Sequence, residues 1–147
     1  MIRQIFHNKK QFLELLLLGD EQESMIDRYL EWGDLFLWEK EGQNIAVAVV
    51  TDEGEGCCEL KNLAVAPSFQ RKGYGRAMLD FLCAHYKGRF TYMQLGTGDS
   101  PLTLPFYEAC GFMKTHCIPN FFIDNYDHPI WEGGKQLVDM IYLRKEL

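Results

Sequence analysis

Short apolar runs and helically spaced apolar residues alternate along the first half of the chain. They predict, in order, a strand over residues 1–6, a helix over 8–19, a second helix over 25–33 and two strands over 35–38 and 45–50. Asn8 can cap the first helix, and Gly19 and Gly33 can end the two helices. Because Glu41-Gly42 separates the two strands, they are expected to form a hairpin.

The second half opens with an apolar run over 57–67 that ends at a proline, which is typical of a buried strand. After it, apolar residues recur at helical spacing, the last of them counted for its ring: Met78, Phe81, Leu82 and His85. The remaining pattern predicts a strand over 90–95, a helix from Ser100-Pro101 to 111, a strand from 112, an aromatic segment over 117–134 and a final strand over 137–143.

This order of elements predicts the fold class. Four early strands followed by alternating helices and strands indicate an α+β fold with a mixed, mostly antiparallel sheet and helices on both faces. The chain has 147 residues, of which 47% are hydrophobic. It is therefore long enough for one sizeable core and too apolar to be disordered.

The segment between the central strand and the next helix is basic and contains two glycines. Helix starts leave backbone N–H groups without intrahelical partners and carry partial positive charge. Gly73 and Gly75 have no side chain to keep a phosphate away, and cationic or amide side chains surround them. This strand, turn and helix start therefore predict an anion site.

The glycine pattern selects one kind of phosphate site. A Walker loop would need Lys-Ser/Thr after the second glycine, where Arg76-Ala77 stands, and a dinucleotide fingerprint would need a third glycine. Gln70 to Gly75 instead fits Gln/Arg-x-x-Gly-x-Gly/Ala, and a second matching stretch follows at 105–112. With these motifs the chain resembles the GNAT superfamily of acetyl-CoA-dependent N-acetyltransferases. The resemblance covers residues 1–147 and implies a single domain with a sheet of about seven strands.

The resemblance also implies where acetyl-CoA binds. The pantetheine arm would pair like an extra strand with the strand before the loop, and the pyrophosphate would lie on the loop itself. The implied coenzyme residues are Leu63, Ala64, Val65, Gln70, Arg71, Lys72, Gly73, Tyr74, Gly75, Arg76, Thr97, Asp99 and Phe106. Asp99 departs from the pattern, because many members have an asparagine there and a carboxylate cannot donate a hydrogen bond.

Two residues are candidates for the catalytic chemistry. Glu59 interrupts an apolar strand, and burial of a carboxyl group raises its pKa toward values useful for a base. The alternatives are that Glu59 pairs with Lys61 and that Asp34 or a chain of waters removes the proton. Tyr107 matches the tyrosine that many family members place beside the coenzyme sulfur, where a phenol can protonate a thiolate. The alternative for Tyr107 is an aromatic residue packed under the sheet.

The expected acceptor is a primary amine of a small molecule or a peptide. Candidate acceptor residues are Trp32, Asp34, Phe121, Tyr126, His128 and Trp131, although the aromatic segment could instead cover the sheet or form a homodimer contact. The acidic stretch Asp20, Glu21 and Glu23 favours a cationic acceptor. A non-catalytic acyl-CoA-binding module is the alternative function.

Charge, cysteines and histidines exclude several classes of function. A net charge of −6 argues against a nucleic-acid partner. Five cysteines, two of them adjacent, indicate reduced thiols and a cytoplasmic location, and the four histidines form no evident metal set. The longest apolar run, Leu15 to Leu18, is far shorter than the ~20 residues of a membrane span. We therefore expect no metal, no nucleic acid and no membrane span.

Overall fold

The computed structural model describes all residues from Met1 to Leu147. Its elements, in chain order, are β1 (Ile2–Ile5), the 3₁₀ helix η1 (Lys9–Phe12), α1 (Leu13–Gly19), α2 (Glu23–Ile26), β2 (Asp34–Lys40), β3 (Gln43–Gly54), β4 (Cys57–Val65), the 3₁₀ helix η2 (Pro67–Phe69), α3 (Tyr74–Tyr86), β5 (Tyr92–Gly98), α4 (Leu104–Ala109), β6 (Met113–Ile118), α5 (Phe121–Asn125), β7 (Trp131–Glu132), β8 (Lys135–Gln136) and β9 (Met140–Glu146).

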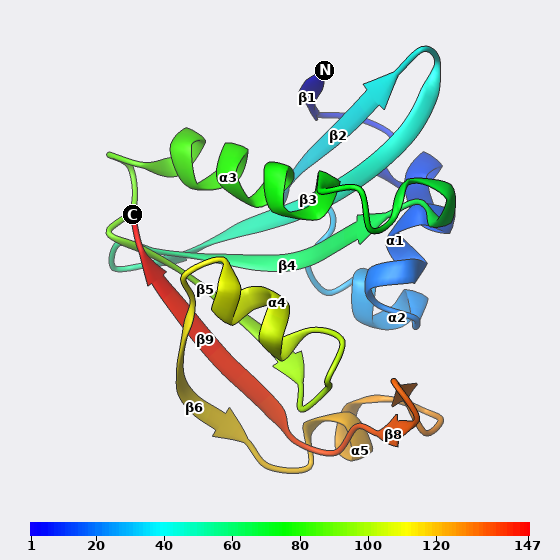
Figure 1. Cartoon of the computed structure of the whole chain (residues 1–147), viewed down its shortest axis with the longest axis vertical. Coiled ribbons are helices and arrows are strands. Elements are labelled where there is room, and N and C mark those ends of the chain that lie inside the picture. The colour runs from blue at the N-terminus through cyan, green and yellow to red at the C-terminus, as the bar shows by residue number, and fades with distance from the viewer.

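Seven strands form the central sheet in the order β1-β2-β3-β4-β5-β9-β6. Every neighbouring pair is antiparallel except β4 and β5, which run parallel. The predicted α+β fold with a mixed, mostly antiparallel sheet is therefore confirmed (Figure 1).

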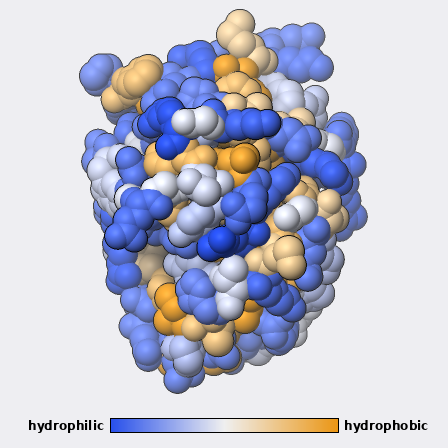
Figure 2. Space-filling view, turned by 90° about the vertical axis from the view of Figure 1, so that its left-hand side faces the viewer, coloured by the Kyte–Doolittle hydropathy of each residue, from blue (hydrophilic) through white to orange (hydrophobic).

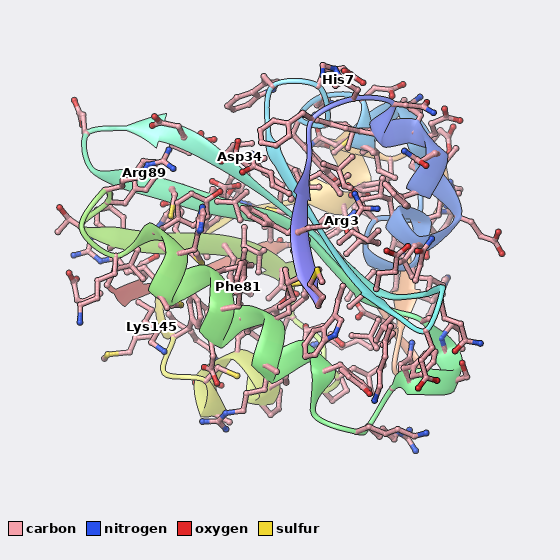
Figure 3. The ribbon with its side chains drawn as sticks, turned by 90° about the horizontal axis from the view of Figure 1, so that it is seen from above. Arg3, His7, Asp34, Phe81, Arg89 and Lys145 are labelled. Carbon is pink, nitrogen blue, oxygen red and sulfur yellow. The ribbon has the colours of Figure 1, made fainter.

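The two faces of the sheet carry separate cores. Along β3, Ala46, Ala48 and Val50 belong to the larger core under α3 and α4, whereas Val47 and Val49 belong to the core under α1. This follows from the period of two along a strand, which sends successive side chains to opposite faces. Figure 3 shows α3 and α1 on opposite sides of the sheet, as helices on both faces require.

Only two of the four residues predicted for the buried face of α3 are fully buried. Met78 and Leu82 are fully buried, but the other two fully buried positions are Leu79 and Tyr86. The predicted Phe81 is partly buried and His85 is exposed. The prediction treated the His85 ring as apolar. In the structure this ring packs edge-to-face against buried Phe36, with ring centroids 5.1 Å apart.

The hairpin was predicted correctly, and the first helices were predicted in part. Glu41 and Gly42 join β2 and β3 with φ angles of 52° and 75°, the left-handed pair that a tight hairpin turn requires. Asn8, in contrast, lies in the left-handed region and makes no side-chain cap to the helix. The first helical segment is therefore a 3₁₀ turn followed by α1 rather than one helix capped by Asn8.

The second predicted helix shortens to one turn, α2, and a buried lysine binds carbonyl groups in the turns that follow it. Lys9 is 7% exposed, and its ammonium donates to the carbonyl oxygens of Leu30 (3.2 Å), Glu31 (3.0 Å) and Gly33 (2.6 Å). A buried charge needs such partners. The three carbonyl groups at the end of this segment thus satisfy the Lys9 ammonium.

Three boundaries in the second half differ from the prediction. The helix expected from Ser100-Pro101 begins at Leu104, and residues 101–103 form turns; the Ser100 hydroxyl accepts a hydrogen bond from the Leu102 N–H (3.1 Å). The strand expected over 90–95 is β5, which extends to Gly98. The final strand expected over 137–143 is shifted to β9, since Leu137 instead packs in a small separate core.

The aromatic segment over 117–134 has a structure that the sequence pattern did not predict. It contains α5 and, with the residues after it, the short hairpin β7–β8. Phe122, Ile130 and Leu137 form the small core beneath them. Figure 1 shows this unit at one end of the molecule, beside the ends of β5 and β9 and below α1 and α2.

Strands β4 and β5 separate partway along their length. Their parallel pairing covers only Cys57–Leu60 against Tyr92–Leu95. Beyond it β4 continues to pair with β3, and β5 continues to pair with β9. The strands diverge visibly in Figure 1. The facing edges of Lys61–Val65 and Gly96–Gly98 are therefore left without a strand partner, and a wedge opens in the middle of the sheet.

The surface seen in Figure 2 is mostly hydrophilic, with hydrophobic residues in separated patches. No helix combines the length and the apolar character needed to cross a membrane. No group of three or more His, Cys, Asp or Glu side chains is arranged to hold a metal ion.

Candidate active site

The wedge between β4 and β5 opens into a cleft with two adjoining halves. One half has a volume of about 250 Å³ and lies along the diverging strands beside α4 and β7. The other half, of about 200 Å³, lies toward α2 and α5. Six residues line both halves: Asp20, Leu60, Lys61, Gly96, Tyr126 and Met140. The point where the strands separate is therefore the centre of the cleft.

The basic loop leads from the end of β4 to the start of α3, as predicted. Gln70 donates its side-chain amide to the Val65 carbonyl (2.9 Å), which ties the loop back to the strand. Arg71 and Gly73 have φ angles of 62° and 90°, and Gly73 immediately precedes the first turn of the 13-residue helix α3. A Cβ atom at Gly75 would lie 3.4 Å from the Phe106 ring, so the glycine allows helix and ring to approach closely.

The predicted coenzyme residues beyond the loop lie at different distances from the cleft. Leu63 and Thr97 line it, and the Thr97 hydroxyl donates to that of Thr103 (2.8 Å). Asp99 is exposed and pairs with Lys135 (2.8 Å), which lowers the pKa of that carboxyl group. The aspartate that departs from the family pattern thus has a partner outside the cleft.

Tyr107 reaches the cleft from α4. Its ring packs edge-on against Phe106 and Phe112, with centroids 5.1 Å and 6.0 Å away. It lines the half of the cleft that follows the diverging strands. Burial raises the pKa of the Tyr107 phenol, with smaller contributions from Cys110 and Glu132, and no hydrogen bond offsets it. The phenol therefore stays protonated across the neutral range.

Glu59 is buried in β4 and has three partners. Lys61 forms an ion pair with it (2.6 Å), Gln94 donates to its other oxygen (2.6 Å), and the Tyr142 hydroxyl approaches at 3.4 Å. It lines the half of the cleft toward α2. The structure thus contains the pairing with Lys61 that was the alternative to a catalytic role, and the catalytic role of Glu59 stays a prediction.

Asp34 lies apart from these residues. Its carboxylate accepts a hydrogen bond from the Tyr86 hydroxyl (2.6 Å) and lines a separate small pocket with Arg89. Figure 3 shows Asp34 and Arg89 near each other at this end of the sheet. Trp32 borders both this pocket and the main cleft.

The aromatic segment covers the cleft and is fastened to the connector between α1 and α2. Phe121, Tyr126 and Trp131 line the cleft as predicted, but His128 does not. His128 instead lies on the surface between Asp127 (2.5 Å) and Glu21 (3.2 Å), and these carboxylates raise its pKa. His128 therefore serves as a surface bridge between the two segments.

Asp20 lies at the centre of the cleft, although the sequence analysis names it only as part of an acidic stretch. Its two carboxylate oxygens accept hydrogen bonds from Tyr126 (2.7 Å) and Tyr29 (3.0 Å). Asn62 donates in turn to the Tyr29 hydroxyl (3.1 Å) and to the Leu16 carbonyl (3.0 Å). Burial raises the pKa of Asp20, and the two tyrosine hydrogen bonds only partly oppose this effect.

Gly96 is a second cleft residue that the prediction omitted. A Cβ atom there would lie 2.5 Å from the Met140 sulfur, so the glycine makes room for a side chain that borders both halves of the cleft. A glycine inside a strand pattern is the sequence signal that could have indicated this close approach.

Comparison with known proteins shows the family. The family model described as acetyltransferase (GNAT) family matches residues 3–112, which include β4, the loop, α3 and Tyr107. The chain belongs to the GNAT family. It is therefore an acyltransferase.

Relatives of this GNAT protein cover nearly its whole length. The uncharacterized N-acetyltransferase YvbK of Bacillus subtilis (strain 168) is 32% identical over 139 residues, which are 93% of this chain and 90% of YvbK. A GNAT family acetyltransferase from Elizabethkingia anophelis with acetyl-CoA bound is 36% identical, with a TM-score of 0.94 over 100% of this chain and 97% of that one. A Bacillus subtilis acetyltransferase in complex with CoA is 31% identical, with a TM-score of 0.89 over 99% and 97%.

Proposed function

We propose that this GNAT protein transfers the acetyl group of acetyl-CoA to a primary amine of a small molecule or a peptide, by direct attack within a ternary complex. The observation that carries this proposal is the wedge between β4 and β5, which leaves a free strand edge that leads directly into the glycine-bearing loop at α3. A thioester on an extended arm with a pyrophosphate at its far end matches this combination of features.

The coenzyme would extend along the free edge of β4. The pantetheine amides would pair with backbone groups of residues 61–65, as an added strand does. The pyrophosphate would lie at the start of α3, where Gly73 and Gly75 leave the backbone N–H groups accessible. Two relatives named above, solved with acetyl-CoA or CoA bound, support acetyl-CoA as the cosubstrate.

Acetyl transfer from a thioester to a neutral amine needs no covalent enzyme intermediate. The enzyme must align the amine with the thioester carbon, accept a proton from the ammonium and stabilise the departing thiolate. Tyr107 would perform the last task, and two observations support this role: its hydroxyl stays protonated, and its side chain lines the cleft beside the diverging strands. A backbone N–H freed by the wedge would stabilise the oxyanion.

The acceptor would enter under the aromatic segment. Phe121, Tyr126 and Trp32 supply apolar surface for its body. Of the three acidic connector residues, Glu23 is paired with Lys10, but Asp20 and Glu21 line the cleft. Carboxylates at the entrance support an acceptor that arrives as a cation.

The test is release of coenzyme A thiol from acetyl-CoA in the presence of a panel of amines that spans polyamines, amino acids, aminoglycosides and peptides. Thiol release that depends on one class of amine is the expected result. A protein that binds acetyl-CoA but releases no thiol with any of them would instead be a binding module. A homodimer remains a prediction, which the mass in solution can decide.

A further inference from the structure

We infer that Asp20 is the general base of this enzyme, the group that takes the proton from the acceptor ammonium. The inference rests on the proposed acetyl transfer and adds a catalytic residue to it. It places the base just after the end of α1, whereas the sequence motifs alone favour Glu59 in β4.

Position is the first argument. Asp20 directly follows the last residue of α1 and lines both halves of the cleft. The other residues shared by the halves include Leu60, the last β4 residue paired with β5, and Gly96, the first residue of β5 beyond its pairing with β4. A thioester held in the wedge would place its carbonyl carbon at this point, and an amine that attacks it would lie next to Asp20.

The surroundings of Asp20 are the second argument. The Tyr29 and Tyr126 hydroxyl groups each donate to one of the two carboxylate oxygens, and no lysine or arginine forms an ion pair with Asp20. The other charged groups around it are Arg28 from the turns after α2, which weakly favours the carboxylate form, Lys61 and Glu59 from β4, Glu21 from the connector and Glu132 from β7. A half-buried carboxylate without a cation is suited to accept a proton, and burial raises its pKa in the same direction.

Glu59, unlike Asp20, forms an ion pair with a lysine. The Lys61 ammonium lies 2.6 Å from one of its oxygens and Gln94 donates to the other at 2.6 Å. The Glu59 carboxylate is therefore already engaged by a cation within the protein. Glu59 thus holds Lys61 in place, whereas Asp20, which lines both halves of the cleft, forms no ion pair.

The acceptor nitrogen loses two protons during the reaction. One N–H proton moves to the Asp20 carboxylate, directly or through one water, and the freed lone pair forms the bond to the carbonyl carbon. The carbon–sulfur bond then breaks, and its electron pair leaves on sulfur, which takes a proton from Tyr107. A second proton from nitrogen restores the Tyr107 hydroxyl, and Asp20 releases its proton to solvent. The products are the amide, coenzyme A thiol and one proton.

The test uses the full-length enzyme, acetyl-CoA and the best amine from the panel. Asp20→Asn should lower kcat/KM by about 10²–10⁴-fold near neutral pH and remove the acidic limb of the pH–rate profile, with acetyl-CoA affinity unchanged. Asp80→Asn, at an exposed carboxylate of α3, is the matched control and should keep the wild-type profile. An Asp20→Asn enzyme that retains the acidic limb would overturn the inference.

A second pair of variants tests the same point without removing either carboxylate. Tyr126→Phe removes one hydrogen bond that stabilises charged Asp20, so the acidic limb should move up by about one pH unit. Gln94→Met removes one hydrogen bond from Glu59 and should leave the limb in place. The reverse outcome, a limb that moves with Gln94→Met and not with Tyr126→Phe, would make Glu59 the base.

Folding does not confound these results. Because burial raises the pKa of Asp20 in the folded state, its charge costs stability as the pH rises through that pKa, and the cost persists at neutral pH. Asp20→Asn should therefore not lower the melting temperature at neutral pH. A wild-type enzyme that is inactive with every amine would refute the proposed function, whereas an active wild type with an unchanged Asp20→Asn profile would refute only this inference.

Discussion

Tyr107→Phe is the substitution that separates chemistry from packing most cleanly. The ring contacts with Phe106 and Phe112 are kept, and the hydroxyl that is lost has no hydrogen bond within the protein. No buried partner is left unsatisfied, so the free energy of unfolding should change by less than about 1 kcal/mol.

The effect on catalysis should be much larger. If the hydroxyl supplies the proton to the departing thiolate, kcat should fall by about 10²-fold, which corresponds to about 2.7 kcal/mol of barrier. Coenzyme affinity should barely change. The assay compares acetyl-CoA with an acetyl donor whose thiol has a lower pKa, because such a leaving group needs less help from a proton. The deficit of Tyr107→Phe should shrink with that donor.

Tyr86→Phe is the matched control with the opposite signature. Its hydroxyl donates to Asp34 at 2.6 Å, outside the main cleft, so its loss should lower stability by about 1 kcal/mol and leave kcat unchanged. Equal deficits of Tyr107→Phe with both donors would mean that Tyr107 positions the coenzyme. A wild-type kcat would make Tyr107 a core aromatic only and would refute the reasoning.

Three further predictions concern the loop, the buried ion pair and the end of α1. Gly75→Glu should abolish acetyl-CoA binding in a folded protein, because the new side chain meets the Phe106 ring and adds negative charge where phosphate would bind; unchanged affinity by calorimetry would contradict the assigned site. Glu59→Gln should lower stability in thermal melts by about 1–3 kcal/mol, since its lysine loses a buried partner, but should keep the acidic limb of the rate profile. Gly19→Ala should cost about 1–3 kcal/mol, measured by urea unfolding, because its Cβ would lie 2.3 Å from the Asn62 amide oxygen; an unchanged midpoint would show that Asn62 can move.

The parts of the fold that the sequence predicted depend on local patterns. Strands β2 and β3 each contain a continuous apolar run, β4 is apolar apart from Glu59, Lys61 and Asn62, and the β2–β3 hairpin is marked by Glu41-Gly42, whose φ angles are both positive. The coenzyme loop could also be placed, because its glycines and basic residues are contiguous and stand between a strand and a helix. Each of these patterns involves only residues that are close together in the sequence.

The features that the sequence did not predict depend on distant residues. Leu137 looks like the start of a strand, but it packs with Phe122 and Ile130 in a small core that only the folded chain creates. No pattern of apolar residues reports this contact.

The acidic cleft shows the same limit. Asp20 lies in a run of mostly acidic residues, a pattern that is typical of a solvent-exposed connector. Its position at the wedge follows from a hydrogen bond to Tyr126, which is 106 residues away in the chain. Asp34, the predicted substitute base, lies in a separate pocket with Tyr86.

The most direct test of the account uses acetyl-CoA labelled with ¹³C in its acetyl group and the amine selected from the panel. The carbon-13 NMR spectrum should show one labelled amide for each coenzyme A thiol released, and no amide should form with Gly75→Glu. Labelled acetate in place of amide would identify a thioesterase. Binding of acetyl-CoA with no change in the label would identify a non-catalytic module, and either result would contradict acetyl transfer to an amine.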